Sequence, residues 1–109
     1  MAITLTAKVA QSAPGAASLT DAYTVPASTK FEGKVIVANR SATGTTFRIS
    51  LAPAGAADAT SQYIVYDLAI PGNDTYTTPN FSIAATAVVR VYATLATVTF
   101  TVTGLEASA

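Results

Sequence analysis

The chain has 109 residues, 50% of them hydrophobic, and its 6 basic and 6 acidic residues cancel to a formal net charge of +0. Charged residues are only 11% of the chain, against roughly 25% in an average soluble domain. The absence of cysteine and histidine excludes disulfides and thiolate metal sites, and it removes the commonest general base and metal ligand. The balanced charge lacks the clustered basic face that nucleic-acid binding requires, so no nucleic-acid partner is expected.

The length predicts a single domain over residues 1–109. Apolar runs extend over only about five to eight residues, well short of the roughly 20 that cross a bilayer, so no membrane partner is expected. The N-terminus has neither the basic region nor the long apolar core of a signal peptide. We therefore expect synthesis in the cytoplasm without classical export.

Short segments that alternate apolar and polar side chains run along the whole chain, and Pro- and Gly-containing turns separate them. In the first segment Ile3, Leu5 and Val9 alternate with Thr4 and Lys8, which is the period of a strand. Eight strands are predicted, over residues 3–9, 20–25, 31–39, 45–52, 62–70, 74–78, 88–94 and 97–103. Residues 81–84 are expected to extend the sixth strand, and residues 56–61 to form a short helical turn. This pattern predicts an all-β fold, a single antiparallel β-sandwich of about eight strands that is jelly-roll-like or Ig-like.

The last two predicted strands, 88–94 and 97–103, have the clearest hairpin pattern, although their connection lacks the Asn-Gly sequence of a type I′ turn. Strand 88–94 is partly apolar on both faces, so we expect a loop or another subunit to cover its second face. Residues 1–18 are expected to form an N-terminal arm or an added strand of this domain.

Three arginines are the strongest candidates for function, because arginine forms bidentate pairs and is enriched at protein interfaces. Each could contact a carboxylate of a second subunit, or form an ordinary cross-strand pair within one subunit. Asp67, which interrupts an apolar strand, is a candidate partner in either arrangement. The predicted interface residues are Arg40, Arg48, Arg90, Asp67 and Tyr92.

The sequence supplies no candidate for catalysis, for a metal or for a cofactor. No two carboxylates have a motif spacing, and the isolated glycines form no phosphate-binding loop. A tyrosine surface for sugar stacking is considered, but Tyr63 and Tyr66 are predicted to project to opposite faces of their strand, which favours core packing. We therefore expect a protein that is not an enzyme and needs no cofactor.

Three stretches carry a family likeness: DAYTVPAST at 21–29, ANRSATGTTFRISLAPAG at 38–55 and YDLAIPGNDT at 66–75. Together they resemble a family of small β-sandwich virion proteins of tailed bacteriophages, over about residues 20–105. The likeness implies a virion protein made in the host cytoplasm and supplies no catalytic residues. The first 18 residues depart from it.

The family resemblance and the low charge together predict a capsid decoration (cement) protein that binds contacts between major capsid subunits. Its partners would be copies of itself, as a homotrimer, and the major capsid protein. The alternative is a tail protein, either a baseplate or a fibre-attachment component that recognises a cell-surface glycan. A glycan hydrolase is the third class, and it would need two carboxylates about 5–10 Å apart in a cleft.

Overall fold

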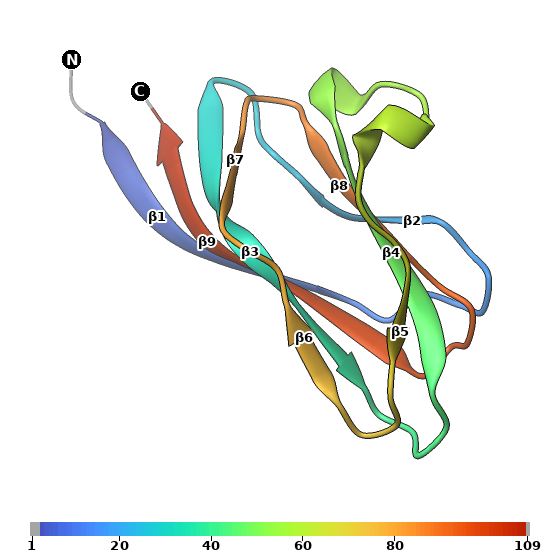
Figure 1. Cartoon of the computed structure of the whole chain (residues 1–109). Coiled ribbons are helices and arrows are strands. Elements are labelled where there is room, and N and C mark those ends of the chain that lie inside the picture. The colour runs from blue at the N-terminus through green and yellow to red at the C-terminus, as the bar shows by residue number, and fades with distance from the viewer. Residues whose placement is uncertain (1–2, 109) are drawn as a thin grey trace.

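Nine strands make up most of residues 3–108, which are the residues that the computed structural model describes (Figure 1). They pack as two antiparallel sheets, so the predicted all-β sandwich is confirmed. The strands are β1 (Thr4–Ser12), β2 (Thr20–Thr24), β3 (Thr29–Asn39), β4 (Thr45–Ala52), β5 (Tyr63–Ile70), β6 (Thr75–Thr77), β7 (Phe81–Ile83), β8 (Val88–Ala93) and β9 (Val98–Ser108).

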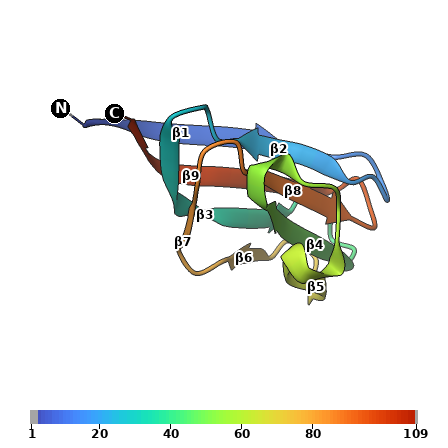
Figure 2. The ribbon, with the colours of Figure 1, turned by 90° about the horizontal axis from the view of Figure 1, so that it is seen from above.

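The first sheet has five strands in the order β1-β9-β3-β6, with β7 also pairing with β3, and the second sheet has the order β2-β8-β4-β5. Figure 2 shows the two sheets stacked so that β1 lies beside β2, β9 beside β8, β3 beside β4 and β6 beside β5. Except for the pairs β4–β5 and β6–β7, strands that follow one another in the chain lie in different sheets. The connections that follow β1, β3, β5 and β8 therefore all cross between the sheets, and they gather at one end of the sandwich (Figure 1).

The core lies between the inner faces of the two sheets, and strand alternation fills it. In β4, Phe47 and Ile49 are fully buried while Arg48 between them points to the outer face, as a pleated strand with one covered face requires. The Phe47 and Phe100 rings meet across the sheets at 6.1 Å between centroids. The largest fully buried side chains are Phe31, Phe47, Phe100, Ile49, Val25, Val35, Val37, Val89, Val91, Val98 and Val102.

The hairpin predicted at the C-terminus is wrong. β8 pairs with β2 and β4, whereas β9 pairs with β1 and β3, so the short connection between them crosses the sandwich. Two strands with one apolar face each satisfy the same alternation whether they pair side by side or face each other across a core. The missing Asn-Gly turn was the one local indication against a hairpin.

Two smaller expectations also change. Residues Phe81–Ile83 form a separate strand, β7, that pairs with β3 and does not extend β6, because Pro79 interrupts the chain between them and proline cannot donate to a ladder. The expected helical turn at 56–61 is replaced by two 3₁₀ turns, Pro53–Gly55 and Thr60–Gln62.

β1 is the outermost strand of the first sheet and pairs only with β9, without a register shift from Thr4↔Ser108 to Ser12↔Phe100. Its N-terminal half projects beyond the rest of the sandwich in both views (Figures 1 and 2). Residues Thr4 to Ala7 are exposed whichever face they point to. Backbone pairing with β9 therefore holds this half of the strand, and no side-chain layer covers it.

Candidate functional site

Arg48 is the centre of a cluster on the outer face of the four-stranded sheet. Its guanidinium carbon lies 4.3 Å from the ring centroid of Tyr66 and 4.5 Å from that of Tyr92, which places the cation between two aromatic faces. Its Nε and Nη2 donate to the two carboxylate oxygens of Asp67 at 2.7 and 3.2 Å. Three of the five predicted interface residues, Arg48, Asp67 and Tyr92, thus lie together.

A β-bulge in β5 assembles this cluster. Phe47 pairs with Leu68 and Ile49 with Val65, so Arg48 faces two residues, Tyr66 and Asp67, where a regular ladder would supply one. Asp67 has a φ of 53°, a left-handed conformation that aspartate tolerates better than most residues. The Arg48–Asp67 pair is therefore a cross-strand pair within one subunit, which is one of the two arrangements considered from the sequence.

The prediction that Tyr63 and Tyr66 project to opposite faces is wrong. A second register shift, between Ile49↔Val65 and Ser50↔Tyr63, inserts one residue and reverses the alternation between the two tyrosines. Their rings meet edge to face, with centroids 5.1 Å apart and planes at 87°. Because Tyr66 is 56% exposed, the cluster presents an aromatic surface to solvent.

The ion pair predicts a measurable titration. The hydrogen bonds from Arg48 hold the pKa of Asp67 below its usual value. Because the folded-state pKa is lowered, the stabilising effect of the pair is present at neutral pH and is lost as pH falls through that pKa. We expect Arg48→Gln to return the Asp67 pKa to the ordinary aspartate range, as measured by NMR titration of the carboxyl carbon. An unchanged Asp67 pKa in this variant would contradict the assigned pairing.

Arg90 bonds to other partners than the Arg48 cluster and holds the β4–β5 loop in place. Its Nε donates to Asp21 at 3.1 Å and its Nη1 to the carbonyl of Ala56 at 2.8 Å, which ties the β4–β5 loop to β8 and β2. A Cβ built on Gly55 in this loop would lie 3.7 Å from a methyl of Val88. The predicted cover over the second face of this strand is thus a loop of the same chain.

Arg40 also acts within the chain. Its Nε donates to the hydroxyl of Thr99 at 2.7 Å and its Nη2 to the carbonyl of Ala96 at 3.0 Å. These bonds attach the end of β3 to the β8–β9 connection. Arg40 and Arg90 are accordingly placed in loop-anchoring contacts and do not join the Arg48 cluster.

The carboxylates of the described chain are distributed among separate partners. Asp58 accepts from the Tyr63 hydroxyl, and Glu106 accepts from the Tyr23 hydroxyl. Burial, and secondly the bond to Glu106, raise the pKa of Tyr23 above its usual value. Within residues 3–108 no three acidic side chains gather closely enough to hold a metal ion.

A second candidate surface is the outer face of the projecting β1–β9 pair, which the sequence did not single out. Leu5 pairs with Ala107 and Ala7 with Leu105, so these side chains share one face. Its large apolar residues are exposed: Ile3 by 68%, Leu5 by 64%, Val9 by 62% and Leu105 by 49%. We call these four residues the apolar face. The alternation of residues 3–9 predicts a strand, but only the topology shows that its apolar side faces solvent.

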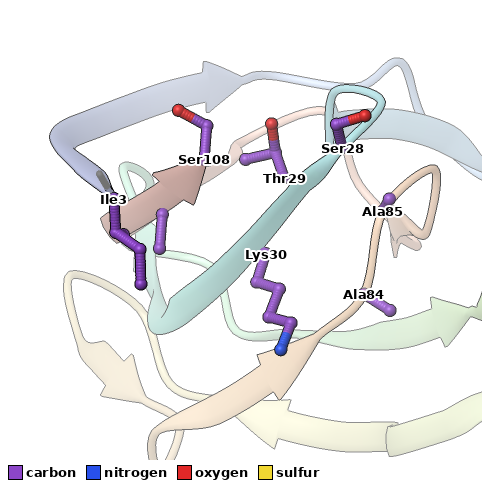
Figure 3. A pocket seen from close by; sticks show the side chains of 8 residues that line it. Ile3, Ser28, Thr29, Lys30, Ala84, Ala85 and Ser108 are labelled. Atoms are coloured by element: carbon purple, nitrogen blue, oxygen red, sulfur yellow. The ribbon is translucent and has the colours of Figure 1, made fainter. Parts of the chain in front are cut away.

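An open cavity of about 580 Å³ adjoins the apolar face. Figure 3 shows Ile3 on one side of it, Ala84 and Ala85 on the opposite side, and Lys30 between them. Its lining contains no carboxylate and one cation, Lys30. The hollow thus offers short apolar walls that suit the side chain of a binding partner better than they suit a reacting group.

Comparison with protein-family models and with curated proteins found no match to the sequence. None of the helical segments within residues 3–108 is long and apolar enough to span a membrane.

Proposed function

We propose that this protein is a non-enzymatic structural component of a phage virion, a capsid decoration protein that binds neighbouring subunits of the major capsid protein. The observation that carries the proposal is the apolar face. Monomeric proteins rarely expose large contiguous apolar patches, and such patches often mark binding sites. Ile3, Leu5, Val9 and Leu105 form such a surface at a projecting end of the molecule, where a larger shell can reach it.

The energetics suit adhesion through this face. Complete burial of an aliphatic side chain contributes about 1.5–3 kcal/mol, so contact with four of them supplies substantial binding free energy. The only charged residue of β1, Lys8, pairs with Gly104 and so points to the opposite face from Leu5 and Val9. Glu32 and Lys30 of β3 lie opposite Leu105 and Ala107, so charges border the apolar face and should give binding to the shell a modest salt dependence.

A lysine placed in the apolar face tests this role. We expect Leu105→Lys to weaken binding to capsids of the phage that encodes the chain by at least about tenfold, since a cation would be buried in an apolar contact. The matched control is Leu68→Lys on β5, another partly exposed leucine, which should bind as the wild type does. Co-sedimentation with purified capsids measures both. Equal binding of the two variants would overturn the assignment of this face.

The second candidate function is a tail baseplate or fibre component that binds a cell-surface glycan. The edge-to-face Tyr63–Tyr66 pair beside Arg48 supports it, because exposed aromatic rings stack on sugars and Tyr66 is half exposed. Retention on polysaccharide without binding to capsids would favour this role. The homotrimer expected from the sequence stays a prediction, and the twofold association inferred below is the competing arrangement.

A further inference from the structure

We propose that the free edge of β1 is the site at which two copies of this chain associate, by antiparallel pairing of one β1 with the other about a twofold axis at Ala7. A strand at a sheet edge presents unpaired backbone N–H and C=O groups that accept a further strand. This association is independent of whether the protein is a virion component.

β1 differs from the other edges of the described sandwich in its length and regularity, although it carries one charged residue, Lys8. β6 and β7 are three residues each and are separated by Pro79. β2 has five residues and a register shift, and β5 has two shifts together with the left-handed Asp67. By contrast, β1 runs for nine residues without proline or bulge. Short, bulged or proline-containing edges resist strand addition, and long regular ones invite it.

The edge is also open. The N-terminal half of β1 projects beyond the sandwich (Figures 1 and 2), and its residues Thr4 to Ala7 are exposed on both faces. A second strand can therefore approach in the plane of the sheet without displacing any element of the same chain.

The sequence of β1 is complementary to itself, which identifies the occupant as a second copy. With the axis at Ala7, Leu5 of one copy lies opposite Val9 of the other, and Lys8 lies opposite Thr6. Glu106 pairs with Thr6 inside each subunit, so the row that contains Lys8 continues through Thr6 to Glu106 of the second copy. No like charges face each other, and cross-strand apolar pairs of this kind stabilise a sheet.

The twofold pairing also limits the assembly to two copies. Each copy has one β1 edge, so a twofold contact uses both edges and leaves only the short β6 and β7 edges at the ends of the joined sheet. It would place the two apolar faces side by side on one surface, with Leu105 and Ala7 of each copy in one continuous row. A dimer would thus join the two apolar faces into one larger surface.

Single-cysteine variants test the register, because the chain contains no cysteine. Residues directly opposite in an antiparallel pair have Cα atoms about 4.5–5.5 Å apart, within disulfide reach. We expect Ala7→Cys to form disulfide-linked dimers on mild oxidation. Leu5→Cys alone and Val9→Cys alone should not, because each residue would lie roughly 13 Å from its own copy. A mixture of Leu5→Cys and Val9→Cys should form the mixed dimer.

The control is Leu68→Cys on β5, which should stay monomeric on oxidation at the same concentration. Sedimentation velocity of the wild-type protein should show a reversible monomer–dimer equilibrium, and Leu5→Lys should shift it several-fold toward monomer while Leu68→Lys leaves it unchanged. A wild-type monomer at all concentrations, a trimer, or cross-linking that does not vary along β1 would overturn the proposal.

Discussion

Replacing Gly104 with alanine is expected to lower the free energy of unfolding by about 3 kcal/mol, at the upper end for overpacking a core. Gly104 and Gly33 are direct cross-strand partners in β9 and β3. A Cβ on Gly104 would lie 2.1 Å from the Glu32 carbonyl oxygen and 2.5 Å from the Gly33 Cα. Both atoms belong to the backbone, so relief requires the central strand pair of the five-stranded sheet to separate.

Urea denaturation of matched variants measures this effect. Gly33→Ala should be similarly destabilising, because its Cβ would lie 2.2 Å from the Thr103 carbonyl oxygen and 2.6 Å from the Phe31 ring. Gly15→Ala is the control, since the nearest atom to its Cβ is the Ser18 hydroxyl at 3.6 Å. If Gly104→Ala were as stable as Gly15→Ala, the close approach of β3 and β9 would be wrong.

Replacing Asn39 with alanine is expected to lower the free energy of unfolding by about 3 kcal/mol, because several buried hydrogen-bond partners would be left unpaired. This is the second large effect that we expect. Asn39 is 3% exposed at the end of β3, and its amide joins three of the crossing connections. Its Nδ2 donates to the carbonyls of Thr43 at 2.9 Å and Pro71 at 3.2 Å. Its Oδ1 accepts from the Ser41 N–H at 3.1 Å and the Thr97 hydroxyl at 3.2 Å.

The control for this prediction is Asn80→Ala, which removes an exposed asparagine and should change stability little. Amide hydrogen exchange distinguishes the mechanism from a general loss of stability. In Asn39→Ala, protection should fall first at the Ser41 and Asn73 amides, because the Asn73 N–H donates to the Ser41 carbonyl at 2.8 Å in the same loop cluster. Uniform loss of protection across all strands would contradict a local role for Asn39.

The sequence could predict the strands but not how they connect. In β4 and in most of β8, apolar residues alternate with polar ones, and this period places Phe47, Ile49, Val89 and Val91 in the core. The same period fits a hairpin or a crossing between sheets, which is why the β8–β9 connection was predicted wrongly. The choice depends on contacts such as those of Asn39, which join loops distant in the chain.

For the candidate sites too, the sequence indicates individual residues but not how the fold brings them together. Arg48, Asp67 and Tyr92 could be selected from the sequence as residues on polar faces, but their meeting depends on two bulges in β5. Strict alternation separates Tyr63 from Tyr66, and a single inserted residue brings them together. The apolar face could not be predicted either, because alternation at 3–9 defines two sides of a strand without showing which side is covered.

The copy number of this protein in purified virions tests the central proposal most directly. The proposal requires that a phage encode the chain, and quantitative gel analysis of that phage's virions compares this protein with the major capsid protein in the same particle. A capsid decoration protein should be present at a number comparable to that of the major capsid protein. Abundance as low as that of the tail proteins would contradict the proposal and favour the baseplate or fibre role.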